Sequence, residues 1–218
     1  RPGSPVVYGN FLTTMDLRSG APTFGTPEAV LSTYAVGQLA RQLNLPLRAG
    51  GHYTASKVAD AQAMVESADA MGAAVYAGAH FVHQAAGWLE GGLVTGYEKF
   101  VMDVDHLGML VRRMQGLVVD DDSLAADGYR EAGPGVAHLG TAHTLAHFAE
   151  ANFTPDLVDT ASFEKWTEDG ALDMQQRAST RWKQMLADYE PPDIDPGVDA
   201  ELRAFVADRK ETVPDAWY

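Results

Sequence analysis

The feature that most constrains the fold is a repeat of strand, loop and helix patterns within the first 120 residues. Short apolar segments at 6–8, 45–49 and 79–86 are each followed by turn-forming or glycine residues and then by a helical pattern. The repeat recurs about every 35 to 40 residues, which is the rhythm of parallel strands joined by crossover helices. The sequence therefore predicts an α/β fold with a parallel sheet.

The helices that follow these strands have recognisable starts and stops. The first should begin after Thr26 as N-cap, with Pro27 at the first helical position and Glu28 in the first turn, and should end near Leu43. Further helices are expected over 56–78, 97–116, 123–131, 143–153, 162–189 with an interruption at 169–170, and 201–210. We expect one domain, with βα units in residues 1–120 and a helical extension in residues 121–218.

The length limits which parallel fold is possible. A (β/α)8 barrel needs about 250 residues and eight strands, whereas this chain has 218 residues and three or four strand candidates. If the fold is a barrel of this TIM type, the chain holds roughly its C-terminal half. The sequence lacks the glycine-rich dinucleotide-binding and P-loop patterns, so the nucleotide-binding α/β folds have no support.

Composition excludes several classes of function. The chain has 46% hydrophobic residues, no cysteine and a formal net charge of −14. The absence of cysteine excludes disulfides and thiolate metal sites, and the acidic balance argues against nucleic acid. No apolar run approaches the roughly 18 residues of a membrane helix. We expect a cytoplasmic protein that binds a small neutral or cationic ligand.

One loop is the first candidate site. Residues 47–62 read LRAGGHYTASKVADAQ, so a strand ends at Gly50-Gly51 and His52 follows directly. Barrels place their active sites at the C-terminal ends of the strands. His52 is therefore either a catalytic residue or a loop histidine bonded to backbone, and Lys57, which can pair with Asp60, is the second catalytic candidate of the same loop.

Several long segments resemble one enzyme family. They include GNFLTTMDLRSGAPTFGTPE, HYTASKVADAQA, LVTGYEKFVMD, REAGPGVAHLGTAHTLAHF and SFEKWTEDGALDMQQRA, and together they cover nearly the whole chain. With these segments the sequence resembles the C-terminal part of the trimethylamine:corrinoid methyltransferase family, whose members are (β/α)8 barrels. The resemblance implies transfer of a methyl group from a methylated amine to the cobalt of a separate corrinoid protein, with no corrinoid tightly bound by this chain.

The resemblance also bears on the substrate. Founding members of the family carry pyrrolysine, which falls in the loop around Lys57, where this sequence has an ordinary lysine. Members without pyrrolysine look like demethylases of quaternary amines such as glycine betaine, proline betaine or carnitine. A quaternary nitrogen is already a good leaving group for attack by Co(I). The resemblance thus implies the non-pyrrolysine, glycine betaine-type branch.

Such a reaction needs aromatic faces around a methylated ammonium group and a polar group for the substrate carboxylate. Tyr53, Phe81 and Trp88 lie at or just after expected strands and are candidates for the aromatic cage, with core packing as the alternative. Asp16 and Arg18 can bind a zwitterion or pair with each other. On the third strand His83 and Gln84 alternate, so at most one points inward; Glu98, Asp103 and Asp105 look like a solvated helix face.

The histidines near the end of the chain allow two interpretations. His143 and His147 are four residues apart and can bind a metal with one further ligand, but no HExxH order accompanies them. We therefore predict no metal site, and instead expect Gly135, His138 and His143 to contact the corrinoid partner, with capping and packing as the alternative. The alternatives to a methyltransferase are a barrel that binds betaines without turnover and, third, a zinc-dependent hydrolase. The helical tail can also mediate a homo-oligomer.

Overall fold

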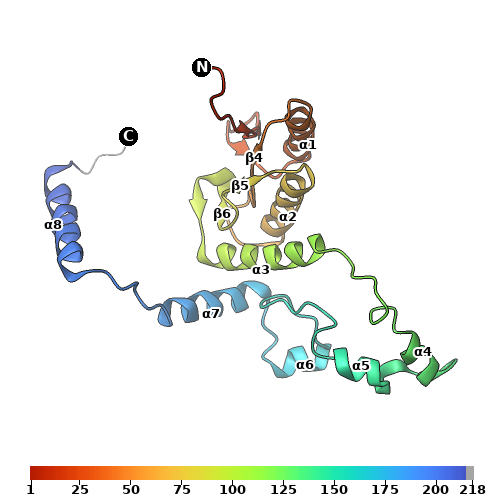
Figure 1. Ribbon diagram of the computed structural model, residues 1–218. Coiled ribbons are helices and arrows are strands. Elements are labelled where there is room, and N and C mark those ends of the chain that lie inside the picture. Colours follow the sequence, from red (N-terminus) through yellow and green to blue (C-terminus); the bar gives the residue numbers. More distant parts are fainter. Residues whose placement is uncertain (215–218) are drawn as a thin grey trace. The chain divides into compact units, whose positions relative to one another are not determined.

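Three parallel strands form the central sheet of the computed structural model, which describes residues 1–214 (Figure 1). Strands β1 (Tyr8–Gly9), β4 (Leu47–Gly50) and β5 (Phe81–His83) pair in this order. The sheet is not closed into a barrel within residues 1–214. The predicted α/β class with a parallel sheet is confirmed at this level.

Two crossover helices cover one face of this sheet. Helix α1 (Pro27–Gln42) connects β1 to β4, and α2 (Ala61–Tyr76) connects β4 to β5; Figure 1 shows the two helices side by side. Their core joins Val36 and Ala40 of α1 to Leu47 of β4 and to Ala77, directly after α2. Since side chains alternate along a strand, Arg48 and Gly50 belong to the opposite face.

The helix starts follow local capping chemistry. The Thr26 hydroxyl accepts a hydrogen bond from the Ala29 N–H, as predicted for the N-cap of α1. The prediction that the second helix begins at Ser56 is wrong, because the Asp60 carboxylate accepts from the Ala63 N–H at 2.9 Å and caps α2 there. The Ser56 hydroxyl instead donates to the Val58 carbonyl within a turn.

Two short antiparallel hairpins lie outside the main sheet. One pairs β2 (Thr14–Met15) with β3 (Pro22–Thr23), and the other pairs β6 (Trp88–Leu89) with β7 (Val94–Thr95) across the 3-10 turn η1 (Glu90–Gly92). The sequence did not predict these pairings, since strands of two residues carry no measurable periodicity.

Helix α3 (Tyr97–Met114) forms a second core with α7 (Met174–Ala187). Val101 and Met102 of α3 pack with Leu157 and with Ala178 of α7. The Asp105 carboxylate accepts hydrogen bonds from two backbone N–H groups, those of residues 156 and 158, at 2.7 and 3.2 Å. Asp105 is therefore a buried structural residue, and the prediction that it lies on a solvated face is wrong.

The remaining helices are short except the last. They are α4 (Ala126–Ala132), the 3-10 turn η2 (His138–Gly140), α5 (Ala142–His147), α6 (Phe163–Glu168) and α8 (Pro196–Thr212). The helix predicted over 143–153 ends at His147, and the one predicted over 201–210 extends in both directions. The chain divides into two units, Arg1–Lys183 and Gln184–Tyr218. Within residues 1–214 no helix is both long and apolar enough to cross a bilayer.

Candidate active site

The loops after the three parallel strands meet at one edge of the sheet. The loop after β4 carries Tyr53, whose hydroxyl donates a hydrogen bond to the side-chain carbonyl of Gln84 in the loop after β5. Burial raises the pKa of Tyr53 to about 12, so the hydroxyl remains a donor at neutral pH. This bond links the C-terminal ends of two neighbouring strands.

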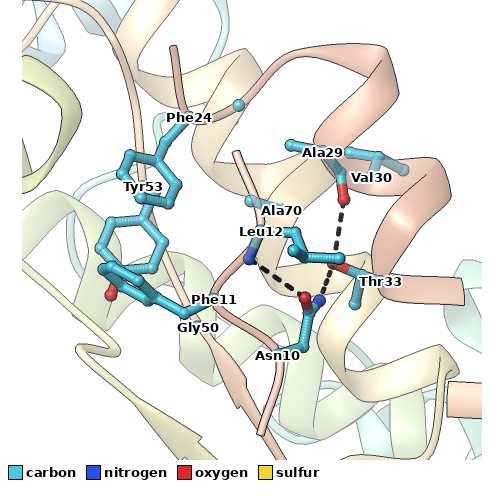
Figure 2. A pocket seen from close by; sticks show the side chains of 11 residues that line it. Asn10, Phe11, Leu12, Phe24, Ala29, Val30, Thr33, Gly50, Tyr53 and Ala70 are labelled. Atoms are coloured by element: carbon cyan, nitrogen blue, oxygen red, sulfur yellow. Dashed lines mark hydrogen bonds between the residues drawn. The ribbon is translucent and has the colours of Figure 1, made fainter. Parts of the chain in front are cut away.

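Three aromatic rings gather beside this edge (Figure 2). The Phe24 and Tyr53 rings stack with centroids 4.6 Å apart, and the Phe11 ring lies 5.2 Å from Phe24 and 6.0 Å from Tyr53. Gly50 is required here, because a Cβ atom at this position would overlap the Tyr53 ring. The rings border a cavity of about 30 Å³ that Asn10 also lines. This volume suits about one water molecule.

Arg48 extends the aromatic group with a positive charge. Its guanidinium carbon lies 5.9 Å from the centroid of the Phe11 ring, and its Nη2 lies 2.6 Å from Nδ1 of His83. Because an arginine is always protonated, it is the donor and the His83 nitrogen accepts. His83 in turn stacks on Phe81, with centroids 5.9 Å apart. Arg48, Phe81 and His83 thus share the sheet face opposite the helices, while the Gln84 side chain reaches Tyr53.

Sequence reasoning missed Arg48, although a signal was present. It is the single charged residue in the strand LRAG, between Leu47 and Ala49, which are both buried. An arginine that alternates with buried apolar residues must point to the other face of the strand. In a strand that ends at a candidate site, this position presents its charge close to that site.

His52 points away from the aromatic group, toward α3. It is fully buried, with Nδ1 2.5 Å from the Ala85 carbonyl oxygen and Nε2 2.8 Å from Nδ1 of His106. Burial lowers the pKa of His52 to about 3 and also lowers the pKa of His106, so both rings are neutral. The carbonyl only accepts, so His52 carries its proton on Nδ1 and His106 donates to Nε2. His52 therefore holds the loop after β5 against α3.

A buried ion pair holds the same loop from α3. The side chains of Lys99 and Asp103 have no exposed surface and form a salt bridge, and Asp103 Oδ2 also accepts from the Gly87 N–H at 2.8 Å. Burial lowers the pKa of Lys99 and raises the pKa of Asp103 to about 6. The other Asp103 oxygen, Oδ1, has no hydrogen-bond partner among the described residues. The expectation that Asp103 is solvated is wrong.

The other candidate residues in the chain segments around the sheet form hydrogen bonds within their own turns or lie in a hairpin. Lys57 is exposed and donates to the Ala55 carbonyl at 2.8 Å, while the Asp60 carboxylate caps α2. The Asp16 carboxylate accepts from the Ser19 hydroxyl and from the backbone N–H groups of Arg18 and Ser19, and these bonds lower the pKa of Asp16. Trp88 is half-buried in the second hairpin.

The residues predicted to contact a corrinoid partner lie in the segment from α4 to α5. Gly135 is exposed with a φ of 75°. The His138 ring meets the Tyr129 ring edge-on at 4.9 Å, and His143 bonds to the backbone carbonyl of Asp122 at 2.7 Å. Within the described residues, Gly135, His138 and His143 make no hydrogen bond or ring contact with the sheet face.

A parallel sheet whose strand ends carry three aromatic rings beside an arginine places the chain, as a class, among α/β proteins. Comparison with known proteins gives the family. The model of the trimethylamine methyltransferase (MTTB) family matches residues 1–214, and the chain belongs to this family. The family predicted from the sequence is confirmed.

Individual relatives agree. The chain is 41% identical over 212 residues to glycine betaine methyltransferase of Desulfitobacterium hafniense strain Y51, covering 97% of this chain and 44% of that protein. It is 32% identical over 209 residues to trimethylamine methyltransferase MttB of another strain of this species, covering 96% and 42%. It is 31% identical over 210 residues to MttB2 of Methanosarcina mazei, covering 95% and 42%. The chain thus spans less than half the length of these relatives.

Proposed function

We propose that the chain is part of a methyltransferase that moves a methyl group from a small methylated amine, betaine-like in chemistry, to the cobalt of a corrinoid protein. Family membership supports the reaction class, and the 41% identity to a glycine betaine methyltransferase supports a quaternary amine as substrate. The observation that carries the proposal is the position of Arg48 beside the Phe11 ring on the free face of the sheet.

This arrangement suits the two ends of a betaine. Aromatic faces attract a quaternary ammonium group through their π electrons, and Phe11, Phe24 and Tyr53 supply three rings within 6.0 Å of one another. A guanidinium group binds a carboxylate through paired N–H donors, and Arg48 supplies it next to these rings. A substrate held in this way has both charges fixed, and one methyl group remains free to react.

The reaction makes few demands on acid or base groups. The C–N bond breaks with its electron pair retained by nitrogen, which leaves as a neutral tertiary amine, and the methyl carbon bonds to the reduced cobalt of the partner. No proton has to move, so Lys57 needs no catalytic role in the transfer. We propose His52 as a positioning residue, since its bonds reach Ala85 and His106 and fix the loop after β5.

The pocket described here is incomplete, and we propose that a longer (β/α)8 barrel completes it. The cavity of about 30 Å³ is too small for a betaine. Strands β1, β4 and β5 follow each other in chain order with both helices on one face, as consecutive βα units of a barrel do. The chain covers 44% of the glycine betaine methyltransferase relative, which leaves room for the remaining strands in the rest of such a protein.

Other residues keep their predicted roles as proposals. Phe81, His83 and Trp88 are proposed to line the completed pocket, and Gly135, His138 and His143 to contact the corrinoid protein. For Asp16 and Arg18 the self-contained turn around the Asp16 carboxylate favours a structural role.

Methyl transfer tests the reaction. The full-length protein is incubated with a reduced corrinoid protein and with glycine betaine, proline betaine, carnitine or trimethylamine, and methyl-cobalt absorbance is recorded. We expect methylation from at least one quaternary amine. Calorimetric binding of a betaine without methyl-cobalt from any substrate would instead favour the non-catalytic binding barrel.

Binding calorimetry tests the role of Arg48. Arg48→Gln should weaken glycine betaine binding at least tenfold but change tetramethylammonium binding less than twofold, because only the betaine has a carboxylate. Arg112→Gln, at an exposed arginine of α3, is the matched control and should change neither. Equal weakening of both ligands by Arg48→Gln would contradict carboxylate recognition at this residue.

A further inference from the structure

A second group of ligand-type side chains lies between the turn before α4 and helix α5. His143 and His147 stand one helical turn apart with ring centroids 4.5 Å from each other. Nε2 of His147 lies 3.0 Å from Oδ2 of Asp122, and Nε2 of His143 lies 3.8 Å from Oδ1 of the same carboxylate. One ligand atom from each of the three residues falls within 4.8 Å of the others.

We propose that Asp122, His143 and His147 form a binding site for a divalent transition-metal cation such as Zn²⁺. Zinc bonds to histidine nitrogen and carboxylate oxygen are about 2.0 to 2.2 Å long, so ligand atoms around a tetrahedral ion lie about 3.3 to 3.5 Å apart. The two nitrogen-to-oxygen distances, 3.0 and 3.8 Å, bracket this separation. The two distances reach different oxygens of the same carboxylate, and one ligand atom from each residue lies within 4.8 Å of the others, so side-chain rotations can bring all three residues onto one ion.

The donor set favours this class of cation. Two imidazole nitrogens with one carboxylate suit zinc and its transition-metal neighbours, whereas magnesium and calcium prefer oxygen alone. Both histidines are half-buried and Asp122 is exposed, so a water molecule can fill the fourth position. Sequence reasoning found the histidine pair but lacked the third ligand, because Asp122 is 21 residues before His143 and only the fold brings them together.

The alternative to a metal is a set of hydrogen bonds. His143 Nε2 also lies 2.7 Å from the Asp122 backbone oxygen, so in the metal-free protein this nitrogen donates to the carbonyl. A bound cation takes the place of that proton on Nε2. His143 Nε2 cannot both donate a proton to this carbonyl and bind a cation. A metal-binding measurement therefore distinguishes the hydrogen-bonded site from the metal site.

A metal here would stabilise a segment that has little core. Between residues 111 and 151 only Gly128 and Thr141 are buried. Small units without a hydrophobic core are commonly stabilised by a structural metal. The ion would connect the turn at Asp122 to α5, so its role is structural.

Titration with Zn²⁺ alone tests the site. The full-length protein is treated with a chelator, dialysed, and titrated in the presence of a chromophoric competitor. We expect one equivalent to bind, at least tenfold more weakly in His147→Ala and in Asp122→Asn. His138→Ala removes an exposed histidine of the same segment that lies outside the group, and it should bind Zn²⁺ like the unaltered protein.

The identity of the ligands has its own measurement. Co²⁺ in place of Zn²⁺ should give visible absorption bands of a four-coordinate ion with nitrogen ligands, and these should disappear in His147→Ala. Asp122→Asn keeps the shape of the side chain, so it replaces His147→Ala in the Co²⁺ measurement if His147→Ala does not fold. Equal Zn²⁺ affinity in the unaltered protein, His147→Ala and Asp122→Asn, or no binding at all, would show that the three residues form hydrogen bonds only.

Discussion

The sheet with its crossover helices and the segment from 111 to 151 differ in how much of their own surface they bury. In the sheet region, Leu47, Ala49, Ala63 and Met71 are almost completely inaccessible to solvent. In the segment from 111 to 151 large apolar side chains are exposed instead, including Phe148 at 78%. Burial of apolar surface is the main stabilising term of a fold. The sheet region thus contains the contacts that stabilise it, whereas this segment does not.

Two salt bridges elsewhere in the chain show the same contrast for charge. Lys99 and Asp103 on α3 are enclosed without exposed side-chain surface, whereas Lys165 of α6 pairs with Asp169, directly after this helix, with more than half of each side chain exposed. Water screens the second pair but not the first. A salt bridge between the same residue types should therefore matter greatly in one place and little in the other.

Removal of Asp103 should have the largest effect. Asp103→Ala leaves the Lys99 ammonium buried without a partner and removes the acceptor for the Gly87 N–H, so we expect a loss of about 3 to 5 kcal/mol in the free energy of unfolding. Asp169→Ala breaks the exposed pair and should cost less than about 1 kcal/mol. Urea denaturation measures both, and similar losses would show that burial does not distinguish the pairs.

The acidic residues of α3 show why the sequence alone does not distinguish buried from solvated charges. The sequence around Asp103 reads YEKFVMDVDHL, and three acidic residues on one helix are typical of a solvated face. Glu98 instead accepts from the Trp182 indole at 2.7 Å, and Asp105 accepts from the backbone near residue 157. These partners are more than 50 residues away along the chain, and helical periodicity contains no information about such contacts.

Local sequence signals predicted the helices near the sheet better than they predicted the burial of charged side chains. Thr26 with Pro27 set the start of α1, and the periodic apolar residues located α1, α2 and α3. At the candidate site, Tyr53 was predicted beside the strand end, and it lines the cavity there. It did not give the direction of His52, because the side chain after Gly50-Gly51 is oriented by His106 and Ala85 from elsewhere in the chain.

Matched leucine substitutions compare the two regions directly. Leu47 in β4 is 1% exposed and packs with Val36 and Ala40, so Leu47→Ala should cost about 2 to 5 kcal/mol of stability. Leu145 in α5 is 66% exposed, and Leu145→Ala should change stability by less than about 0.5 kcal/mol. Thermal and urea unfolding provide the comparison. A large loss for Leu145→Ala in the full-length protein would show that residues beyond those described here cover α5.

A further effect concerns His52 and depends on pH. The pKa of His52 is about 3 in the folded chain and about 6.5 in an unfolded one, so the unfolded state binds the extra proton first. The stabilising contribution of neutral His52 is fully present above about pH 6.5 and is lost as the pH falls toward 3. From pH 7.5 to pH 5 the loss should be about 2 kcal/mol.

The His52→Asn variant isolates this contribution. The raised pKa of Asp103 acts in the opposite direction over part of the same pH range. Its contribution to the free energy of unfolding is lost as the pH rises toward about 6. Asp103 is present in both proteins, so its effect cancels when the unfolding free energies of His52→Asn and the unaltered protein are subtracted at each pH. His106 touches His52 and can change with it, so its ring is followed by NMR titration. The difference should shrink between pH 7.5 and 5; a constant difference would mean that His52 stabilises the loop only through its contacts with Ala85 and His106.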